Sequence, residues 1–401
     1  MIQVEIIFFL SLGLISYACI GYPILIVVLS RLRERPVRKN DILPKVSVII
    51  AAHNEERDIA AKIENTLALD YPDQKLEIIV ASDCSTDRTD DIVRDYANRG
   101  VILHRQPERL GKTMAQNSAV DISSGEVLVF TDATTGCRGD ALRKIVRSFA
   151  DAEVGCVSSQ LVYADRSKTS VGSGCRSYWS YESLLREAES RLGSMIGVTG
   201  CLYAVRRTNY TPLEHDMCSD FVIASEIHKK GLRTIDEPEA VSVEKTNNRS
   251  RDEFRMRVRI MEQTMSALSR YREVLSIRRH GFFAFQMLSH KVARYAVSAF
   301  LLLALISNLL IVSEHRLYQA TLGLQLAFYV SALIGGIFTR FSMRAGPLSL
   351  PYYFVLANAA TIVAFAKHVR GENHVVWEPL RETNHSNSQM AAAKAASRTA
   401  G

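Results

Sequence analysis

The sequence predicts an α/β fold in which a doubly wound domain lies between an N-terminal transmembrane helix and a C-terminal cluster of transmembrane helices. Two observations support this prediction. From Pro44 onward, short β-branched runs alternate with helical stretches, a pattern typical of a parallel sheet covered by helices. Long apolar runs stand near both ends of the 401 residues, and 47% of all residues are hydrophobic, enough for a soluble core and several membrane spans.

The composition excludes several classes of protein. A formal net charge of +7, from 49 basic and 42 acidic residues, is too small to indicate nucleic-acid binding. The seven cysteines show no C-x-x-C or Cys/His spacing, so we expect neither a zinc site nor a disulfide framework. A reducing compartment fits this cysteine usage best. Composition leaves the oligomeric state open.

Residues 1–30 are expected to form an N-terminal membrane anchor. The run from Ile6 to Leu29 is almost uncharged and long enough to cross a hydrocarbon core of roughly 30 Å. A signal peptide would start with basic residues and end in small ones, whereas this segment starts MIQVE and ends at arginines. The basic linker 31–43 favours the inside. We therefore expect a retained anchor whose following domain faces the cytoplasm.

The domain 44–278 is expected to bind a nucleotide at one edge of its sheet. The predicted strands are VSVIIAA, LEIIVAS, GVILHR and EVLVFTD, and ligands of such sheets lie beyond the carboxyl ends of the strands. Polar residues follow each of these strands: His53, Asn54, Glu55, Asp83, Ser85, Arg105 and Asp132. We therefore expect these residues to line a binding site, except His53, to which no chemistry is assigned.

Two common nucleotide signatures are absent from the expected positions. No G-x-G-x-x-G follows the first strand, so a dinucleotide site is not supported. The string from Leu110 to Thr113 imitates the end of a P-loop, but Gln106 occupies the place of its first glycine. An ATPase is therefore not expected.

The C-terminal third is expected to be embedded in a membrane. Residues 279–292 resemble an interfacial amphipathic helix, and about three transmembrane helices are expected within 293–370. A polar tail, 371–401, follows. The basic residues after the last apolar run and the count of spans disagree about the side of the C-terminus, so the exact number of spans stays open.

Seven sequence pieces in a fixed order resemble glycosyltransferase family 2, the inverting GT-A enzymes that include many exopolysaccharide and capsule transferases. The resemblance covers about 44–272. The matching pieces are PKVSVIIAAHNEE, ASDCSTDRT, LGKTMAQNSAV, VFTDATT, VTGCLYAVRR, CSDFVIASEIHKKGLR and RMRVRIMEQ. This resemblance implies a GT-A fold, a nucleotide-sugar donor and a divalent metal ion.

The first polar cluster suits a nucleoside. Asn54, Glu55 and Asp83 offer hydrogen-bond acceptors and a donor to a base and ribose, and Ser85 stands beside them. By resemblance, Asp83 and Glu55 hold the uridine of a UDP-sugar. The structural alternative is that Asn54 and Asp83 only cap the helices that follow them.

Asp132 is the candidate metal ligand. In the family this position is the first acid of a D-x-D motif, whose metal bridges the phosphates of the donor. Here the motif reads Asp132-Ala133-Thr134, so its second acid is missing. Mg²⁺ or Mn²⁺ suits an oxygen-only shell of this kind. The alternative is an ordinary aspartate in a turn at the end of a strand.

Asp220 is the candidate catalytic residue. It matches the family's general base, which removes the proton of the acceptor hydroxyl during one inverting displacement. Ser219 stands where the family usually has an acid. Ser219 and Asp220 also fit an ordinary helix start, which is the structural alternative.

Four basic residues are candidates for contact with the diphosphate: Arg105, Lys112, Arg257 and Arg259. The two later arginines stand where processive synthases carry Q-x-x-R-W, an element this chain lacks. Guanidinium groups clamp phosphate well. A solvated or lipid-facing basic stripe explains Arg257 and Arg259 equally well.

We therefore expect an inverting transferase that moves a sugar from a UDP-sugar to a polyprenyl-linked or growing glycan acceptor. The site would face the cytoplasm at a bacterial inner membrane, in surface polysaccharide synthesis. Two alternatives stay open: a processive synthase with a translocation channel, and a catalytically inactive membrane scaffold that binds nucleotide-sugars. The donor sugar, its nucleobase and the acceptor hydroxyl are not predicted.

Overall fold

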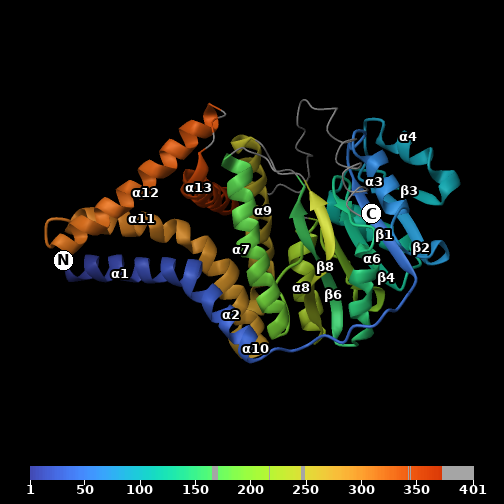
Figure 1. Cartoon of the computed structure of the whole chain (residues 1–401), viewed down its shortest axis with the longest axis horizontal. Helices are drawn as coiled ribbons and strands as arrows, with labels where there is room; N and C mark the ends of the chain where they lie inside the picture. The colour runs from blue at the N-terminus through green and yellow to red at the C-terminus, as the bar shows by residue number, and fades with distance from the viewer. Residues whose placement is uncertain (165–169, 216, 245–248, 342, 344, 373–401) are drawn as a thin grey trace.

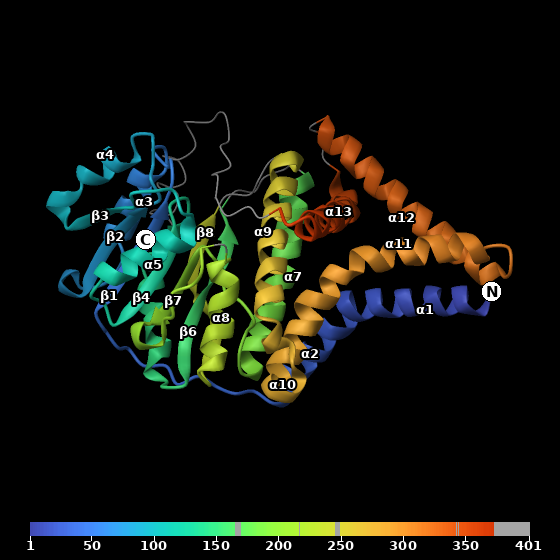
Figure 2. The ribbon, with the colours of Figure 1, turned by 180° about the vertical axis from the view of Figure 1, so that it is seen from behind.

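The computed structural model describes residues 1–164, 170–215, 217–244, 249–341, 343 and 345–372. A sheet covered by helices stands at one end of the molecule, and long apolar helices stand at the other (Figure 1). Two helices, α7 (Ser170–Leu192) and α9 (Ser250–Arg270), lie between these parts in both views (Figure 2). The architecture is therefore α/β with apolar helices attached to one flank.

The four predicted strands are confirmed. They are β1 (Val46–Ala52), β2 (Leu76–Ser82), β3 (Val101–Arg105) and β4 (Val127–Asp132), and all of them pair in parallel. Because parallel strands end at the same edge, the polar residues that follow them gather there.

Four further strands complete the sheet formed by the described residues. They are β5 (Gly136–Cys137), β6 (Val154–Tyr163), β7 (Leu202–Arg206) and β8 (Arg233–Glu244), in the order β3-β2-β1-β4-β7-β6-β8-β5. Strand β7 runs antiparallel to β4 and β6, while β6 and β8 are parallel. The sheet is thus mixed. The carboxyl end of β8 lies at the same edge as those of β1 to β4.

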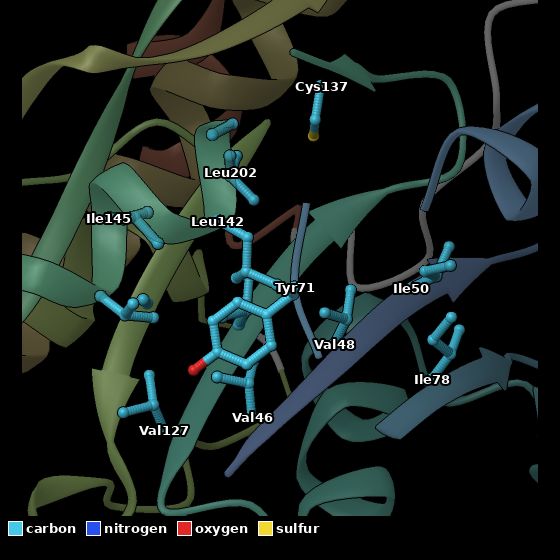
Figure 3. Close-up of a cluster of buried hydrophobic side chains, with 14 of the residues drawn as sticks. Val46, Val48, Ile50, Tyr71, Ile78, Val127, Cys137, Leu142, Ile145 and Leu202 are labelled. Carbon is cyan, nitrogen blue, oxygen red and sulfur yellow. The ribbon is translucent and has the colours of Figure 1, made fainter. Parts of the chain in front are cut away.

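Helices cover both faces of the sheet because successive strand residues point to opposite sides. Val48 and Ile50 pack under α3 (Ile59–Leu67), α4 (Thr89–Arg94) and α6 (Ala141–Val146) (Figure 3). Ile49 faces the other layer, formed by α5 (Lys112–Ile122) and α8 (Ser219–Lys229). The strand edge is therefore supported by helices on both faces of the sheet.

Four helical segments of the described chain are long and apolar enough to cross a membrane. The first joins α1 (Ile2–Ser16) to α2 (Tyr22–Leu32), and the second joins α10 (Ile277–Gln286) to α11 (Ala293–Ile311), each through a π-helical turn. The others contain α12 (Arg316–Arg340) and α13 (Ser349–Val369). The segment 279–292, predicted as an interfacial helix, runs directly into α11, with Phe283, Met287 and His290 buried.

A buried set of charges fastens the apolar helices to α7. His290 contacts Glu189 at 2.7 Å and Glu182 at 3.0 Å, and Arg294 donates to Glu182 at 2.5 Å. The Tyr22 hydroxyl donates to Glu189 at 2.6 Å. We call Tyr22, Glu182, Glu189, His290 and Arg294 the junction cluster. It joins α7 to both the first and the second apolar segment.

Candidate active site

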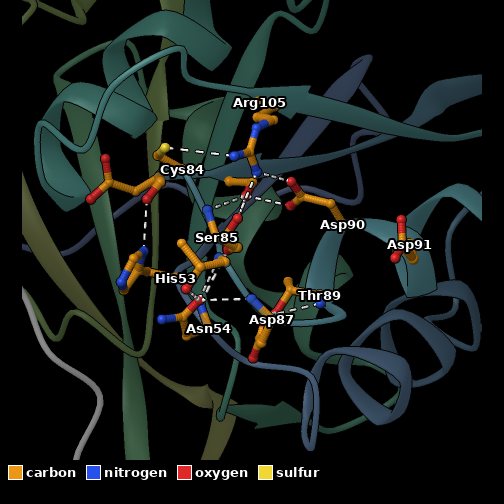
Figure 4. Close-up of polar contacts among 12 residues, drawn as sticks. His53, Asn54, Cys84, Ser85, Asp87, Thr89, Asp90, Asp91 and Arg105 are labelled. Atoms are coloured by element: carbon orange, nitrogen blue, oxygen red, sulfur yellow. Dashed lines mark hydrogen bonds and ion pairs between the residues drawn. The ribbon is translucent and has the colours of Figure 1, made fainter.

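The loops after β1 and β2 are tied to each other. Asn54 and Cys84 take left-handed backbone conformations, with φ of 55° and 53°, which turn the chain sharply at the strand ends. The Asn54 side-chain oxygen accepts hydrogen bonds from the backbone N–H of Thr86 at 2.7 Å and Asp87 at 3.3 Å. The Asn54 N–H donates to Ser85 Oγ at 3.1 Å (Figure 4). Three predicted residues, Asn54, Ser85 and the neighbouring Glu55, therefore lie at one edge.

Asp83 holds the turn that precedes α5. Its carboxylate accepts from the backbone N–H of Leu110 at 2.8 Å and of Gly111 at 2.9 Å. Gly111 has φ of 92°, a conformation that favours glycine, and Lys112 follows as the first residue of α5. Asp83 thus positions Lys112. The side chains of Asn54 and Asp83 bond to neighbouring loops, and neither caps the helix that follows it.

Arg105 lies on the far side of this edge. Its guanidinium pairs with Asp90 and donates to the Ser85 carbonyl at 2.8 Å (Figure 4). Asp90 also accepts from Ser82 at 2.5 Å. Arg105 therefore holds the loop that follows β2. These contacts do not include Asp132 or Asp220.

Asp132 and Asp220 meet at Lys112, and we call these three residues the Lys112 cluster. Lys112 forms an ion pair with Asp132 at the end of β4. Gly200 marks the position of Asp220: a Cβ there would stand 2.8 Å from Asp220 Oδ2 and 3.4 Å from Lys112 Nζ. Burial acts to lower the pKa of Lys112, but the charges of Asp132 and Asp220 raise it above its ordinary value. The structure thus joins two acids that are 88 positions apart in the sequence.

Asp220 is held in place by its own loop. It lies in the first turn of α8, where the helix dipole favours a negative charge. The Cys218 thiol donates to Asp220 Oδ1 at 2.7 Å, and the Asp220 carbonyl accepts from Val198 N–H at 2.8 Å. The carboxylate oxygen Oδ2 is the one that faces Gly200.

The two arginines of α9 face different surroundings. Burial lowers the pKa of Arg259, while the charges of Cys218, Asp132 and Asp220 act in the opposite direction. Arg259 therefore lies within electrostatic reach of the Lys112 cluster. Arg257 instead donates to Glu253 at 2.9 Å and to the Tyr353 hydroxyl at 3.0 Å. The structure thus joins Arg257 to α13, away from the acids.

Glu244 is a site residue that the sequence analysis missed. It ends β8, and the Cys201 thiol donates to its Oε2 at 3.4 Å. Burial, and next the charge of Asp132, raise the pKa of Glu244 to about 7. The strand-end rule that selects Asp132 would have selected Glu244 had β8 been predicted. Its run RTIDEPEAVSVE contains a proline and charges, which hide a strand.

Among the residues that the structure describes, no group of three or more His, Cys, Asp and Glu side chains could hold a metal ion alone. The chemistry of the site nevertheless suits a cation. Asp132 and Glu244 offer carboxylate oxygens, and the ammonium of Lys112 already lies against Asp132. A hard cation such as Mg²⁺ would find oxygen donors here and would complete its shell from phosphate and water.

Several known proteins are similar to this chain. The family model described as Glycosyl transferase family 2 matches residues 47–210. A beta-monoglucosyldiacylglycerol synthase from Nostoc sp. is 29% identical over 192 residues, which are 47% of this chain and 41% of that protein. A poly-beta-1,6-N-acetyl-D-glucosamine synthase from Staphylococcus aureus is 24% identical over 216 residues, 52% of each chain. The chain thus spans about half of these relatives or less.

The fold is also found in a solved structure. The mannosyltransferase PcManGT from Pyrobaculum calidifontis, in complex with GDP-Man and Mn²⁺, superposes with a TM-score of 0.70 at 24% identity. The match covers 92% of this chain and 100% of that one, so it includes the apolar helices. At this identity the likeness supports the fold alone. Together, the family match over residues 47–210, the GT-A-like sheet and the curated relatives support a family 2 glycosyltransferase.

Proposed function

We propose that this chain is an inverting glycosyltransferase that moves a sugar from a UDP-sugar to a lipid-linked or growing glycan acceptor. The observation that carries the proposal is the Lys112 cluster. It brings the strand-end acid Asp132 and the helix-start acid Asp220 together beside the loops of Asn54 and Asp83. A nucleotide held by those loops would direct its diphosphate toward Lys112.

Each residue of the site has a distinct task in this proposal. Asn54, Glu55, Asp83 and Ser85 bind the nucleoside, whose hydrogen-bonding groups they match. Lys112 and Arg259 hold the negative charge of the diphosphate. Asp132 would hold a Mg²⁺ or Mn²⁺ ion, which supplies neutralising charge to the leaving diphosphate when bound.

Asp220 takes the proton in this mechanism. Its Oδ2 lies beside Gly200, while Oδ1 is held by the Cys218 thiol. The acceptor hydroxyl would give its proton to Oδ2 as its oxygen bonds to the anomeric carbon. The bond from that carbon to the diphosphate breaks on the opposite face, so the anomeric centre inverts. Arg105 and Arg257 have no chemical task here, because their contacts are with Asp90 and Tyr353.

The apolar helices and the basic linker support the proposed acceptor and membrane side. Four candidate spans beside the site suit an acceptor that is carried by a lipid, such as a polyprenyl-linked glycan. The arginines of the linker 31–43 favour a cytoplasmic domain at a bacterial inner membrane, where nucleotide-sugars are made. A reporter fused near Lys168, outside the described residues, should behave as cytoplasmic. Periplasmic activity of that fusion would contradict this orientation.

A panel of sugar nucleotides tests the activity. Membranes that contain the full chain would be incubated with labelled UDP-, GDP- and dTDP-sugars, with and without EDTA, and transfer to lipid and polymer fractions would be measured. We expect one UDP-sugar to be consumed and EDTA to abolish its consumption. Consumption of none of these donors would contradict the proposal.

A processive synthase is the second candidate. It is favoured by the similarity to the poly-beta-1,6-N-acetyl-D-glucosamine synthase, which extends over 52% of both chains. The length of the product separates the two functions. A single added sugar supports the transferase, and a long polymer made without release supports the synthase.

A further inference from the structure

We propose that Glu244 supplies the carboxylate that the D-x-D motif of this chain lacks, so that Asp132 and Glu244 together hold the divalent cation of the donor. This inference rests on the proposed function, because it names the metal ligands of the same site. It concerns a residue on β8, far from the motif in the sequence.

The motif Asp132-Ala133-Thr134 supplies only one carboxylate to a metal ion. Thr134 occupies the position of its second acid and is exposed. A neutral hydroxyl is a poorer ligand for a divalent ion than a carboxylate. Sites for Mg²⁺ typically use one or two carboxylates together with substrate phosphates. A second acid from another strand would restore that set.

Two separate strand contacts bring Glu244 toward Asp132. On one side, Thr131 pairs with Leu202, so the adjacent Asp132 and Cys201 stand opposite each other. The Cys201 thiol then donates to Glu244 Oε2 at 3.4 Å. On the other side, the chain that leaves Asp132 forms β5, whose Gly136 pairs with Val243. The residue after Val243 is Glu244, so both routes end beside the same carboxylate.

A positively charged group already lies against Asp132. The Lys112 ammonium forms an ion pair with Asp132 and lies near Gly200 and the second acid there, Asp220. Lys112 and Arg259 balance the charges of Asp132 and Asp220, and Glu244 adds one further acid. The carboxyl groups of Asp132 and Glu244 therefore offer oxygen atoms from two strands to one divalent cation. Lys112 can then turn to the diphosphate.

The test measures metal binding directly. Mn²⁺ would be titrated into the purified full chain with saturating UDP, and free Mn²⁺ would be followed by its electron paramagnetic resonance signal. Loss of even an outer partner of a metal ligand typically lowers metal affinity by about 10- to 100-fold. We therefore expect Glu244→Gln and Asp132→Asn each to weaken Mn²⁺ binding by at least about 10-fold.

Two further variants make this test specific. Glu239→Gln changes an exposed acid of the same strand, which pairs with Lys144, and should leave Mn²⁺ affinity unchanged. Thr134→Asp restores the second acid of the motif and should recover Mn²⁺ binding in the Glu244→Gln protein. Recovery would also show that Glu244→Gln is folded.

The outcomes separate this inference from the proposed function. Unchanged Mn²⁺ affinity in Glu244→Gln, or no Mn²⁺ binding by the unmodified chain, would overturn the role of Glu244. If the unmodified protein still consumes a UDP-sugar, only the metal assignment fails. If no donor is consumed, the proposed function fails, while the titration still decides whether Glu244 binds Mn²⁺.

Discussion

The molecule contains two clusters of opposite charges that differ in how completely they are enclosed. In the Lys112 cluster, the side chains of Lys112 and Asp132 keep 22% and 24% of their surface exposed. In the junction cluster, the side chains of His290 and Glu182 keep 1% and 7%. Charges of the first kind can exchange partners when a ligand enters. Charges of the second kind are fixed, because removal of one partner leaves another charge buried alone.

The contrast also shows what each cluster joins. The Lys112 cluster collects residues from β4, α5 and α8, all at one edge of the sheet. The junction cluster links α7 to the first and second apolar segments. We therefore expect changes in the first cluster to affect transfer and changes in the second to affect stability.

The largest effect is expected from Asp220→Asn. Loss of a positioned general base typically slows a reaction by about 10²- to 10⁴-fold. The substitution keeps the size of the side chain, so UDP affinity, measured by calorimetry, should change little while single-turnover transfer collapses. Asp121→Asn, on the exposed side of α5, is the matched control and should transfer normally. Near-normal transfer by Asp220→Asn would show that Asp220 is not the general base and only stabilises the start of α8.

A large loss of stability is expected from Glu182→Gln. This change breaks the contacts of His290 and Arg294 with a buried carboxylate, and breaking such a pair typically costs about 3–5 kcal/mol. The thermal unfolding temperature in detergent should fall, while transfer per folded molecule should stay the same. Glu187→Gln is the control on the same helix, because Glu187 is 39% exposed. Equal unfolding temperatures for both variants would contradict a structural junction.

A smaller effect on transfer is expected from Gly200→Ala. The added Cβ would stand 2.8 Å from Asp220 Oδ2, so the carboxylate must shift. Displacing a reacting group by 1 Å can cost about 10²-fold in rate, and we expect a loss of about 10- to 100-fold. Gly139→Ala is the control, since no atom lies within 4 Å of its added Cβ. If both variants transfer sugar equally fast, the position of the Asp220 carboxylate beside Gly200 does not matter for transfer.

The smallest effect concerns pH. Asp236 lies on β8, 3.8 Å from Arg186 of α7, with 3% of its side chain exposed. Burial raises the pKa of Asp236 to about 7, despite the opposing charge of Arg186. The folded state therefore binds this proton more tightly than the unfolded chain, whose aspartate pKa is about 3.9. The stabilisation from protonated Asp236 is fully present below about pH 3.9 and is lost as pH rises through about 7.

Asp236→Asn should reduce this pH dependence. The unfolding temperature of the unmodified chain would be compared at pH 5 and pH 8 with that of the variant. We expect a smaller difference in the variant, because its amide does not titrate. Asp140→Asn, at a side chain that is 36% exposed, should keep the original difference. An unchanged difference in Asp236→Asn would show that other groups cause the pH dependence.

The sequence by itself determined the parallel half of the sheet and the apolar helices. Alternating β-branched runs fix β1 to β4, and the strand-end rule selects Asn54, Asp83 and Asp132 without knowledge of the fold. The order of the motifs added Asp220 by resemblance. These signals are local, so they can be recognised within a few residues.

Only the tertiary structure decided which of these residues meet. The two arginines of α9 are two positions apart, yet helix geometry sends Arg259 toward the acids and Arg257 toward Tyr353. Glu244 comes to the same edge only because β8 runs parallel to β6 and pairs with β5. Such pairings depend on contacts between distant segments, and no short pattern in the sequence records them.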